Sequence, residues 1–462
     1  MNTVIKNEIL EAKNMTSRRI FLKKMTTAGV ATMLTPVILK GEMNPQSITE
    51  MQRNSHPVLP NNNLQIALIG AGGMGLADAN TALKHKGVKL MAVADLYDGR
   101  LEKIKEVYGK DIQTTRDYRE IINREDIDAV IVATHDHWHK DIAVATLNAG
   151  KHVYLEKPMI HSISEGHELI AAQKKSGKVL EVGSQLLSSL GYEKAKELVK
   201  SDAIGNLNLA EGVWQRRTST GAWNYNIPED ASPQTLDWDT FLKDKKRYEF
   251  APERFFRWRK YVDYGTGMNG DLFVHIISGL HFVMDSYGPN KIYSSGGIRY
   301  WKDGREVPDV LIGTFDYPET KQHPGFNLSL RCNFVDGTNN GYVMRMVGSE
   351  GMLEVYENKV TLFRNKVLSN EDPIMVLNTA KDVEARKKIV GPEEVVYKAQ
   401  EEYKGSHYDH FGYWFKAIKN GGDVVENSTF GYRAAAPAVL CNESYQEKKV
   451  VEWDPVKMKK IN

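Results

Sequence analysis

Short apolar runs occur in two regions of the chain, which differ in what separates the runs. In the first region, runs rich in Ile, Leu, Val and Ala occur at residues 64–69, 89–94, 128–134, 152–155 and 179–182. Apolar residues at helical spacing separate these runs, as at 142–147 and 169–175. Because buried parallel strands alternate with helices in this way, the pattern predicts a doubly wound parallel sheet over residues 64–186.

In the second region, from about residue 290, only turns separate the apolar runs, which occur at residues 291–293, 310–315, 327–334, 341–347 and 352–356. This texture predicts a large, open, mostly antiparallel sheet, and Asp336-Gly337 predicts a hairpin between two of its strands. The charged segment 368–404 is expected to be surface helix or loop. Helical spacing returns at 407–420 and 432–446. We therefore expect a second, α+β domain over residues 187–456.

The N-terminal segment has the pattern of an export signal. Ser17-Arg18-Arg19-Ile20-Phe21-Leu22-Lys23 matches the twin-arginine motif, and the mildly apolar residues 25–39 are shorter than the roughly 20 residues that span a bilayer. We expect residues 1–41 to be a signal segment, 42–63 to be a linker, and the protein to be periplasmic without a stable membrane anchor. An accidental Arg-Arg pair before an apolar helix is the alternative.

Composition excludes some classes of partner. The 462 residues include 61 Lys and Arg against 59 Asp and Glu, a formal charge of +2, so no global field favours nucleic acid or a membrane surface. The two cysteines, Cys332 and Cys441, lie far apart without metal-ligand spacing, which argues against a zinc site or a disulfide framework. A small polar molecule is the expected partner, and no metal site is expected.

A glycine-rich turn follows the first apolar run. The motif Gly70-x-Gly72-x-x-Gly75 is typical of the turn that brings backbone N–H groups and a helix N-terminus to a pyrophosphate. Asp95 ends the next run, where a carboxylate binds ribose hydroxyls and repels a 2′-phosphate. The pattern predicts NAD as the cofactor, and nearby Arg100 leaves NADP as the alternative.

Polar residues follow three further strands, in Thr134-His135-Asp136-His137-Trp138-His139, Glu156-Lys157-Pro158 and Gly183-Ser184-Gln185. Because carboxyl ends of parallel strands share one rim, these stretches are expected to line one site. With the glycine turn and Asp95, in this order, they resemble the Gfo/Idh/MocA family of sugar and polyol oxidoreductases over about residues 64–456. The resemblance implies a large open sheet after the Rossmann domain, whose face carries substrate and often the oligomer contact.

The resemblance also implies site residues. Those expected to bind the cofactor are Gly70, Gly72, Gly73, Met74, Gly75, Asp95, Thr134, His135, His137, Trp138, His139, Glu156, Lys157 and Gln185. Lys157 becomes the central catalytic lysine, since an ammonium near a carbinol oxygen stabilises developing negative charge. A solvated lysine before a turn-forming proline is the alternative.

The family's Asp-x-x-x-His element matches Asp271 and His275, whose i, i+4 spacing puts both on one helical face. Asp271 is expected to orient substrate and His275 to take the hydroxyl proton, with a core histidine as the alternative for His275. Met268-Asn269, before Asp271, departs from the family pattern. His281 departs from it too, and it is either a substrate contact or structural.

An insertion rich in aromatic and arginine side chains extends from Trp214 to Tyr261. Aromatic faces and guanidinium groups suit stacking on, and hydrogen bonding to, sugar rings. The expected substrate contacts are Trp214, Arg216, Arg257, Trp258, Tyr264 and His281. A packed surface subdomain is the alternative.

Three functional hypotheses follow. The first is NAD-dependent oxidation of a secondary hydroxyl of a sugar or glycoside, with the resemblance favouring the third carbon. The second is a glycosidase that oxidises, eliminates, adds water and reduces, as in the NAD-dependent α-N-acetylgalactosaminidases, although the His-His-Gly type sequence of those hydrolases is not evident. The third is a sugar-binding protein in which NAD is structural.

Export limits the supply of cofactor, because the periplasm is not expected to hold a free NAD pool. We therefore expect the folded protein to carry a tightly held cofactor through the twin-arginine machinery. Its hydride would return within one cycle or pass to a second substrate. A homo-oligomer that pairs through the open sheet is expected by analogy.

Overall fold

The computed structural model describes residues 47–52, 63–338, 342–365 and 393–461. The expected signal segment, residues 1–41, lies outside these ranges. Within them, no helix has both the length and the apolar character that a membrane crossing requires.

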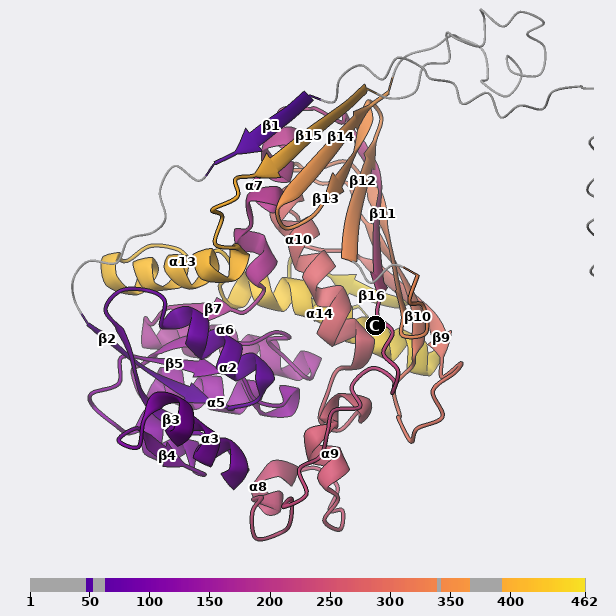
Figure 1. The fold of residues 1–462 in the computed structure, drawn as a ribbon. Coiled ribbons are helices and arrows are strands. Elements are labelled where there is room, and N and C mark those ends of the chain that lie inside the picture. The colour runs from indigo at the N-terminus through magenta and orange to yellow at the C-terminus, as the bar shows by residue number, and fades with distance from the viewer. Residues whose placement is uncertain (1–46, 53–62, 339–341, 366–392, 462) are drawn as a thin grey trace, which may run out of the picture. The chain divides into compact units, whose positions relative to one another are not determined.

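A six-stranded sheet forms the core of the first half (Figure 1). Its order is β4 (Gln113–Thr115), β3 (Val88–Ala94), β2 (Leu64–Ile69), β5 (Ala129–Val132), β6 (His152–Leu155) and β7 (Leu180–Val182). All its pairings are parallel. The helices between the strands are α2 (Gly73–Ala82), α3 (Asp98–Tyr108), α4 (Tyr118–Ile122), α5 (His139–Asn148) and α6 (Gly166–Ser176). The five apolar runs coincide with five of these strands, which confirms the predicted doubly wound sheet.

Eleven strands form the second sheet. Its order is β1 (Ser47–Met51), β15 (Glu393–Ala399), β14 (Lys359–Arg364), β13 (Gly351–Val355), β12 (Tyr342–Gly348), β8 (Leu207–Gln215), β11 (Phe326–Asn333), β10 (Val310–Tyr317), β9 (Lys291–Gly297), β16 (Val451–Asp454) and β17 (Lys459–Lys460). Two of the pairings, β1 with β15 and β8 with β11, are parallel and the others are antiparallel. The predicted large, mostly antiparallel sheet is confirmed.

Helices cover one face of this large sheet (Figure 1). They are α7 (Leu190–Lys200), α10 (Val274–Met284) and α14 (Ser428–Glu447), of which α7 contacts β13 to β15 and α14 contacts β9. Buried and exposed residues alternate along β10 and β11, so one face of each strand enters the core. This packing holds α10, which carries His275, against a rigid support.

The hairpin predicted at Asp336-Gly337 is wrong. Strand β8 lies between β11 and β12, parallel to the first and antiparallel to the second, so the strands on either side of the dipeptide are not neighbours. Asp336 does form a local turn, accepting a hydrogen bond from the Thr338 amide at 2.9 Å. Asp336-Gly337 therefore indicates a local turn only. β8, a strand from much earlier in the chain, pairs with both β11 and β12 and keeps them apart.

Two stretches predicted to lack strands join the edge of the large sheet. Strand β1 lies within the expected linker 42–63, and β15 lies within the segment 368–404 expected to be helix or loop. The two strands pair in parallel, and Met51 of β1 and Val396 of β15 are buried. Ile48 in β1 is 60% exposed, which explains the weak signal. The remainder of 368–392 lies outside the described residues.

The insertion between β8 and α10 packs as an aromatic subdomain. It contains α8 (Trp238–Leu242), α9 (Pro252–Phe256) and the 3-10 turn η4 (Trp258–Lys260). Backbone hydrogen bonds of 2.9 Å join it to the loop after β3, from Asp237 to Leu96 and from Asp98 to Thr235. The subdomain is therefore attached to the rim of the parallel sheet.

Candidate functional site

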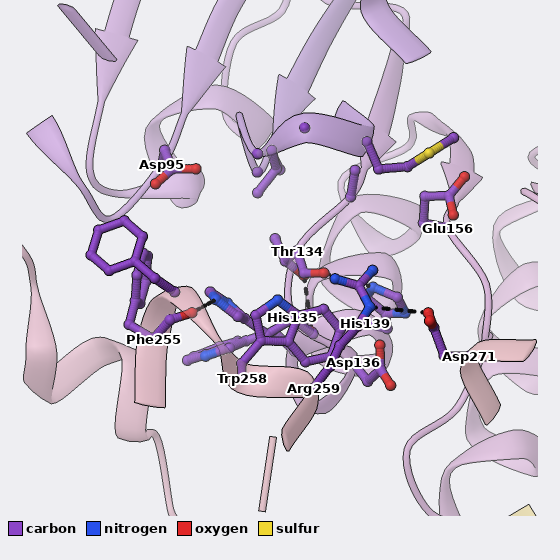
Figure 2. Close-up of a pocket in the computed structure, with 18 of the residues that line it drawn as sticks. Asp95, Thr134, His135, Asp136, His139, Glu156, Phe255, Trp258, Arg259 and Asp271 are labelled. Atoms are coloured by element: carbon purple, nitrogen blue, oxygen red, sulfur yellow. Dashed lines mark hydrogen bonds and ion pairs between the residues drawn. The ribbon is translucent and has the colours of Figure 1, made fainter. Parts of the chain in front are cut away.

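A cavity of about 670 Å³ lies where the carboxyl ends of β2, β3, β5 and β6 meet the aromatic subdomain and the second domain (Figure 2). Its wall comes from the glycine turn, the stretches after β5 and β6, β8, and the π-helical turn η5 (Asn269–Phe273) before α10. Side chains from both sheets thus face one space.

The glycine turn is shaped by close backbone contacts. Gly70 has a φ of +97°, and a Cβ there would lie 2.4 Å from the Ala133 carbonyl oxygen. A Cβ at Gly75 would lie 1.9 Å from the Gly70 carbonyl oxygen. Gly72 and Gly73 line the cavity, together with Met74, whereas Gly75 does not line it and instead allows α2 to approach the turn. The turn presents bare backbone at a helix N-terminus, as pyrophosphate binding requires.

Asp95 is held rigidly at the end of β3. Its Oδ2 accepts a hydrogen bond from the Ala71 amide at 2.7 Å, and its Oδ1 accepts one from the Tyr97 amide at 3.0 Å. Arg100 forms an ion pair with the same carboxylate at 3.2 Å. The guanidinium also lies over the rings of Phe255 and Phe256 of the aromatic subdomain. This end of the cavity combines a carboxylate with stacking surfaces, which fits the adenosine half of a dinucleotide.

The stretch after β5 divides between the cavity and the core. Thr134, His135, Trp138 and His139 line the cavity, whereas the Nε2 of His137 lies 2.8 Å from the Phe241 carbonyl oxygen within the aromatic core. The predicted placement of His137 in the cofactor site is therefore wrong. The His137 ring packs on Phe241 and Tyr264, with ring centroids 5.5 and 5.3 Å away. Burial lowers the pKa of His139 to about 4, so its ring is uncharged.

Asp136, from the same stretch, also lines the cavity. Its Oδ2 accepts hydrogen bonds from the amide and the hydroxyl of Thr266, at 2.9 and 2.7 Å. Burial raises the pKa of Asp136 to about 6, against the opposing effect of the Arg259 charge. The carboxylate therefore joins the rim of the parallel sheet to the second domain.

Lys157 and Asp271 meet in the cavity, as the sequence motifs require. The Nζ atom of Lys157 lies 2.9 Å from both the Oδ1 and the backbone oxygen of Asp271. Arg259 donates from Nε to the same Oδ1 at 3.0 Å, a contact drawn in Figure 2. Burial alone would raise the pKa of Asp271, but the charges of Arg259 and Lys157 hold it well below its ordinary value. Asp271 is an ionised carboxylate shared by two cations.

His275 follows one helical turn later and also lines the cavity. Its ring stacks on Trp214, with centroids 5.5 Å apart, and its Nδ1 is buried without a partner among the described residues. Burial and the Lys157 charge lower its pKa to about 3. The imidazole is therefore neutral at neutral pH, so one of its ring nitrogens carries an unprotonated lone pair.

Glu156 and Gln185 occupy the rim beside Lys157, and both line the cavity. The Gln185 amide donates to Oε1 of Glu156 at 2.9 Å. Burial, reinforced by Asp78, raises the pKa of Glu156 to about 8, so the carboxyl group is protonated at neutral pH.

The expected substrate contacts separate into two groups. Trp214, Arg216 and Trp258 line the cavity. Arg257, Tyr264 and His281 do not line it, which corrects their expected placement. These three contact other protein groups: Arg257 donates to the Tyr225 carbonyl oxygen, Tyr264 is fully buried in the aromatic core, and His281 lies 2.9 Å from the Tyr317 hydroxyl.

Sequence analysis did not single out Arg116 and Tyr118, which line the cavity. Tyr225, Phe255, Phe256 and Arg259 also line it and lie in the insertion expected to contribute to the substrate wall, but they were not among the substrate contacts named individually. Arg259 adjoins two predicted residues, but only the geometry of η4 shows which arginine of this stretch faces Asp271. Among the described residues, no group of three or more His, Cys, Asp or Glu is arranged to hold a metal ion, and both cysteines are buried and free.

Residues 64–184 match the GFO_IDH_MocA model, described as "Oxidoreductase family, NAD-binding Rossmann fold". This match covers the parallel sheet and the strand-end motifs named above, apart from Gln185, which lies one residue beyond it. It agrees with the bare glycine turn and with the Asp95 carboxylate at the end of β3.

Curated relatives of the chain include dehydrogenases and a glycosidase. The inositol 2-dehydrogenase of Salmonella typhimurium is 29% identical over 178 residues, which are 37% of this chain and 50% of that protein. The myo-inositol 2-dehydrogenase of Thermotoga maritima is 21% identical over 85% of this chain and 99% of its own. The alpha-N-acetylgalactosaminidase of Shewanella oneidensis is 25% identical over 35% of this chain and 39% of that protein. The chain spans about half the length of the inositol 2-dehydrogenases that it matches.

Solved structures share the fold over most of the chain. Levoglucosan dehydrogenase, in complex with NADH and levoglucosan, has a TM-score of 0.61 at 20% identity, covering 84% of this chain and 99% of that chain. An oxidoreductase domain protein from Kribbella flavida has a TM-score of 0.62 at 19% identity, covering 85% of this chain and 99% of that chain. Both domains therefore follow one known two-domain architecture.

Proposed function

We propose that the protein moves a hydride between a secondary hydroxyl of a sugar or glycoside and NAD, because residues 64–184 match the model of the Gfo/Idh/MocA oxidoreductase family. The observation that carries the proposal is the 2.9 Å contact of Lys157 with Asp271, in the cavity that the glycine turn also lines. Relatives named for inositol and a structural neighbour named for levoglucosan support a polyhydroxylated ring as the substrate.

The side chains have complementary roles in this reaction. The Lys157 ammonium stabilises negative charge that develops on the carbinol oxygen. The Asp271 carboxylate orients the sugar and holds Lys157 in place. A ring nitrogen of the neutral His275 accepts the hydroxyl proton. NAD, when bound, supplies the hydride acceptor at carbon 4 of its nicotinamide, and the third carbon of the sugar is the proposed donor.

The proposed cofactor is held tightly. The aromatic subdomain lies over the Asp95 end of the cavity, where Phe255 and Phe256 contact Arg100 and backbone hydrogen bonds attach it to the loop after β3. A dinucleotide bound there would have to displace these contacts to leave. Such retention suits export through the twin-arginine route to the periplasm, which we propose from the N-terminal motif.

A redox-neutral glycosidase is the second candidate. The match to an alpha-N-acetylgalactosaminidase favours it, at 25% identity over 35% of this chain. A ketone at the third carbon acidifies the neighbouring C–H, which permits elimination of the glycosidic oxygen, addition of water and return of the hydride. The residues needed for the first oxidation are the same as in the dehydrogenase.

One assay separates these candidates. The purified protein is incubated with a panel of disaccharides, and the products are analysed by mass spectrometry. A keto-sugar indicates the dehydrogenase, free monosaccharides with unchanged oxidation state indicate the glycosidase, and unaltered disaccharide with bound NAD indicates a sugar-binding protein. The dehydrogenase proposal predicts keto-sugar, and free monosaccharides alone would contradict it.

A further inference from the structure

Two cations share one carboxylate oxygen at the sugar end of the cavity. Oδ1 of Asp271 accepts from Lys157 at 2.9 Å and from Nε of Arg259 at 3.0 Å. The Arg259 guanidinium also stacks on Trp258, with its Cζ 4.2 Å from the ring centroid. These two contacts fix the plane of the guanidinium group (Figure 2).

The outer nitrogens of Arg259 remain available. Neither Nη atom has a hydrogen-bond partner among the described residues, and the side chain, which lines the cavity, keeps 23% of its surface exposed. A planar guanidinium fixed through Nε presents two parallel N–H donors, the geometry that a carboxylate matches.

Charges around this end of the cavity do not balance. Arg216 lines the same wall, and no carboxylate pairs with it in the part of the chain that the structure describes. Three carboxyl groups face Lys157, Arg216 and Arg259. Asp136 and Asp271 are carboxylates, whereas burial raises the pKa of Glu156 to about 8 and leaves its carboxyl group protonated at neutral pH. The histidines add no compensating charge, and an oxidised nicotinamide would add one more positive charge. Uncompensated charge in a largely buried site is costly, so a bound anion would stabilise the site.

The adenosine end of the cavity differs in this respect. There Arg100 pairs with Asp95 at 3.2 Å, and Arg116 pairs with Asp98. The excess of positive charge thus belongs to the end where the substrate would lie.

We propose that the substrate is an anionic sugar, a uronate or uronide, whose carboxylate binds the two Nη groups of Arg259 and is attracted by Arg216. This inference rests on the proposed hydride transfer, and it adds the substrate class. Because Arg259 and Lys157 contact the same oxygen of Asp271, the reacting hydroxyl and the carboxylate belong on one sugar ring. Arg259 is a specificity-determining residue in this account.

Matched pairs of glycosides test the proposal. The kcat/KM for methyl glucuronide is divided by that for methyl glucoside, and the same ratio is taken for the galactose pair. In at least one pair the wild-type ratio should be about tenfold or more, the size expected when a desolvated charge pair is made in one complex and not in the other. Arg259→Lys and Arg216→Gln should each lower that ratio severalfold. The matched control Arg247→Lys, in an exposed ion pair of the same insertion, should leave it unchanged.

The ratio distinguishes recognition from a structural role. If Arg259 only positions Asp271, Arg259→Lys lowers kcat/KM equally for both glycosides, and the proposal is overturned. A wild-type ratio near one in both pairs overturns it too, while the hydride-transfer proposal survives through turnover of the neutral sugar.

Calorimetric binding keeps the test decisive when neither glycoside is oxidised. Tighter binding of the uronide, weakened by Arg259→Lys, supports the anion site even though hydride transfer to these sugars fails. Equal binding of uronide and glucoside overturns the site. A methyl glucoside 6-sulfate that binds more tightly than the uronide would replace the carboxylate by a sulfate ester and overturn the uronate assignment.

Discussion

The Nζ atom of Lys157 lies 2.9 Å from Oδ1 of Asp271, although 114 positions separate the two residues in the chain. Lys157 follows β6 of the parallel sheet, and Asp271 lies in the π-helical turn that leads into α10. Their side chains are only 11% and 9% exposed, so solvent screens this ion pair weakly. The contact joins the cofactor rim to the helix that carries His275.

Removal of the ammonium tests its proposed chemical role. Lys157→Ala should lower kcat by about 100-fold to 10,000-fold, because no other group replaces the charge beside the carbinol oxygen. Cofactor content, measured by absorbance after denaturation, should remain near that of the wild type, since the glycine turn and Asp95 are untouched. Turnover within a few fold of the wild type would remove Lys157 from the mechanism.

Loss of the Asp271 charge should affect stability as well as activity. Asp271→Asn leaves two buried cations without their carboxylate and should lower the free energy of unfolding by about 3 kcal/mol at neutral pH. Because the charges of Arg259 and Lys157 hold the pKa of Asp271 below its unfolded value, this contribution is complete above about pH 4 and is lost only in more acidic solution. Urea unfolding at pH 5 and pH 7 should therefore give the same difference.

An exposed ion pair provides the control for that experiment. Asp239→Asn, which breaks the pair with Arg247, should change the free energy of unfolding by less than about 1 kcal/mol. A loss for Asp271→Asn no larger than this would contradict a buried, shared carboxylate.

The contribution of Glu156 to stability should depend on pH in the opposite direction to that of Asp271. Burial raises its pKa to about 8 in the folded protein, so the folded state binds more protons than the unfolded state between about pH 4.5 and pH 8. Stability then falls as pH rises through this range. Glu156→Gln removes the titration, so its free energy of unfolding should gain on the wild type by up to about 1.4 kcal/mol per pH unit. The same difference at pH 6 and pH 8 would contradict a protonated Glu156.

The Asp95 carboxylate should determine the preference for NAD over NADP. The wild-type protein should bind NAD more tightly than NADP, because the carboxylate repels a 2′-phosphate. Asp95→Ser leaves Arg100 without its 3.2 Å partner and should shift the ratio of the two dissociation constants toward NADP by about 10-fold to 100-fold. Fluorescence titration of protein stripped of nucleotide measures both constants, and an unchanged ratio would place the ribose elsewhere.

Local sequence carried enough information for the parallel sheet and its motifs, because each apolar run and each strand-end stretch lies within a few residues. The order of the large sheet depends on contacts across the chain, so neither β8 between β11 and β12 nor the pair of β1 and β15 had a local signal. The departure from the predicted hairpin is therefore a consequence of long-range pairing.

Side-chain direction limited the prediction of the site. His135 lines the cavity and His137 does not, although both belong to one short motif. Of the two histidines on α10, His275 lines the cavity. His281 lies away from the cavity, 2.9 Å from the hydroxyl of Tyr317 on β10. The residue types at these positions indicated the chemistry. Which of the side chains point into the cavity depends on the turn after β5 and on the rotation of α10 about its axis.

Transfer of an isotopic label tests the central claim most directly. The protein with bound NAD is mixed with a glycoside that carries deuterium on its third carbon, and the cofactor is recovered after a single turnover. The account predicts that deuterium appears at carbon 4 of the reduced nicotinamide, and that Lys157→Ala abolishes the transfer. Oxidation of the sugar with the label released to water, or with the nicotinamide unlabelled, would contradict direct hydride transfer in this cavity.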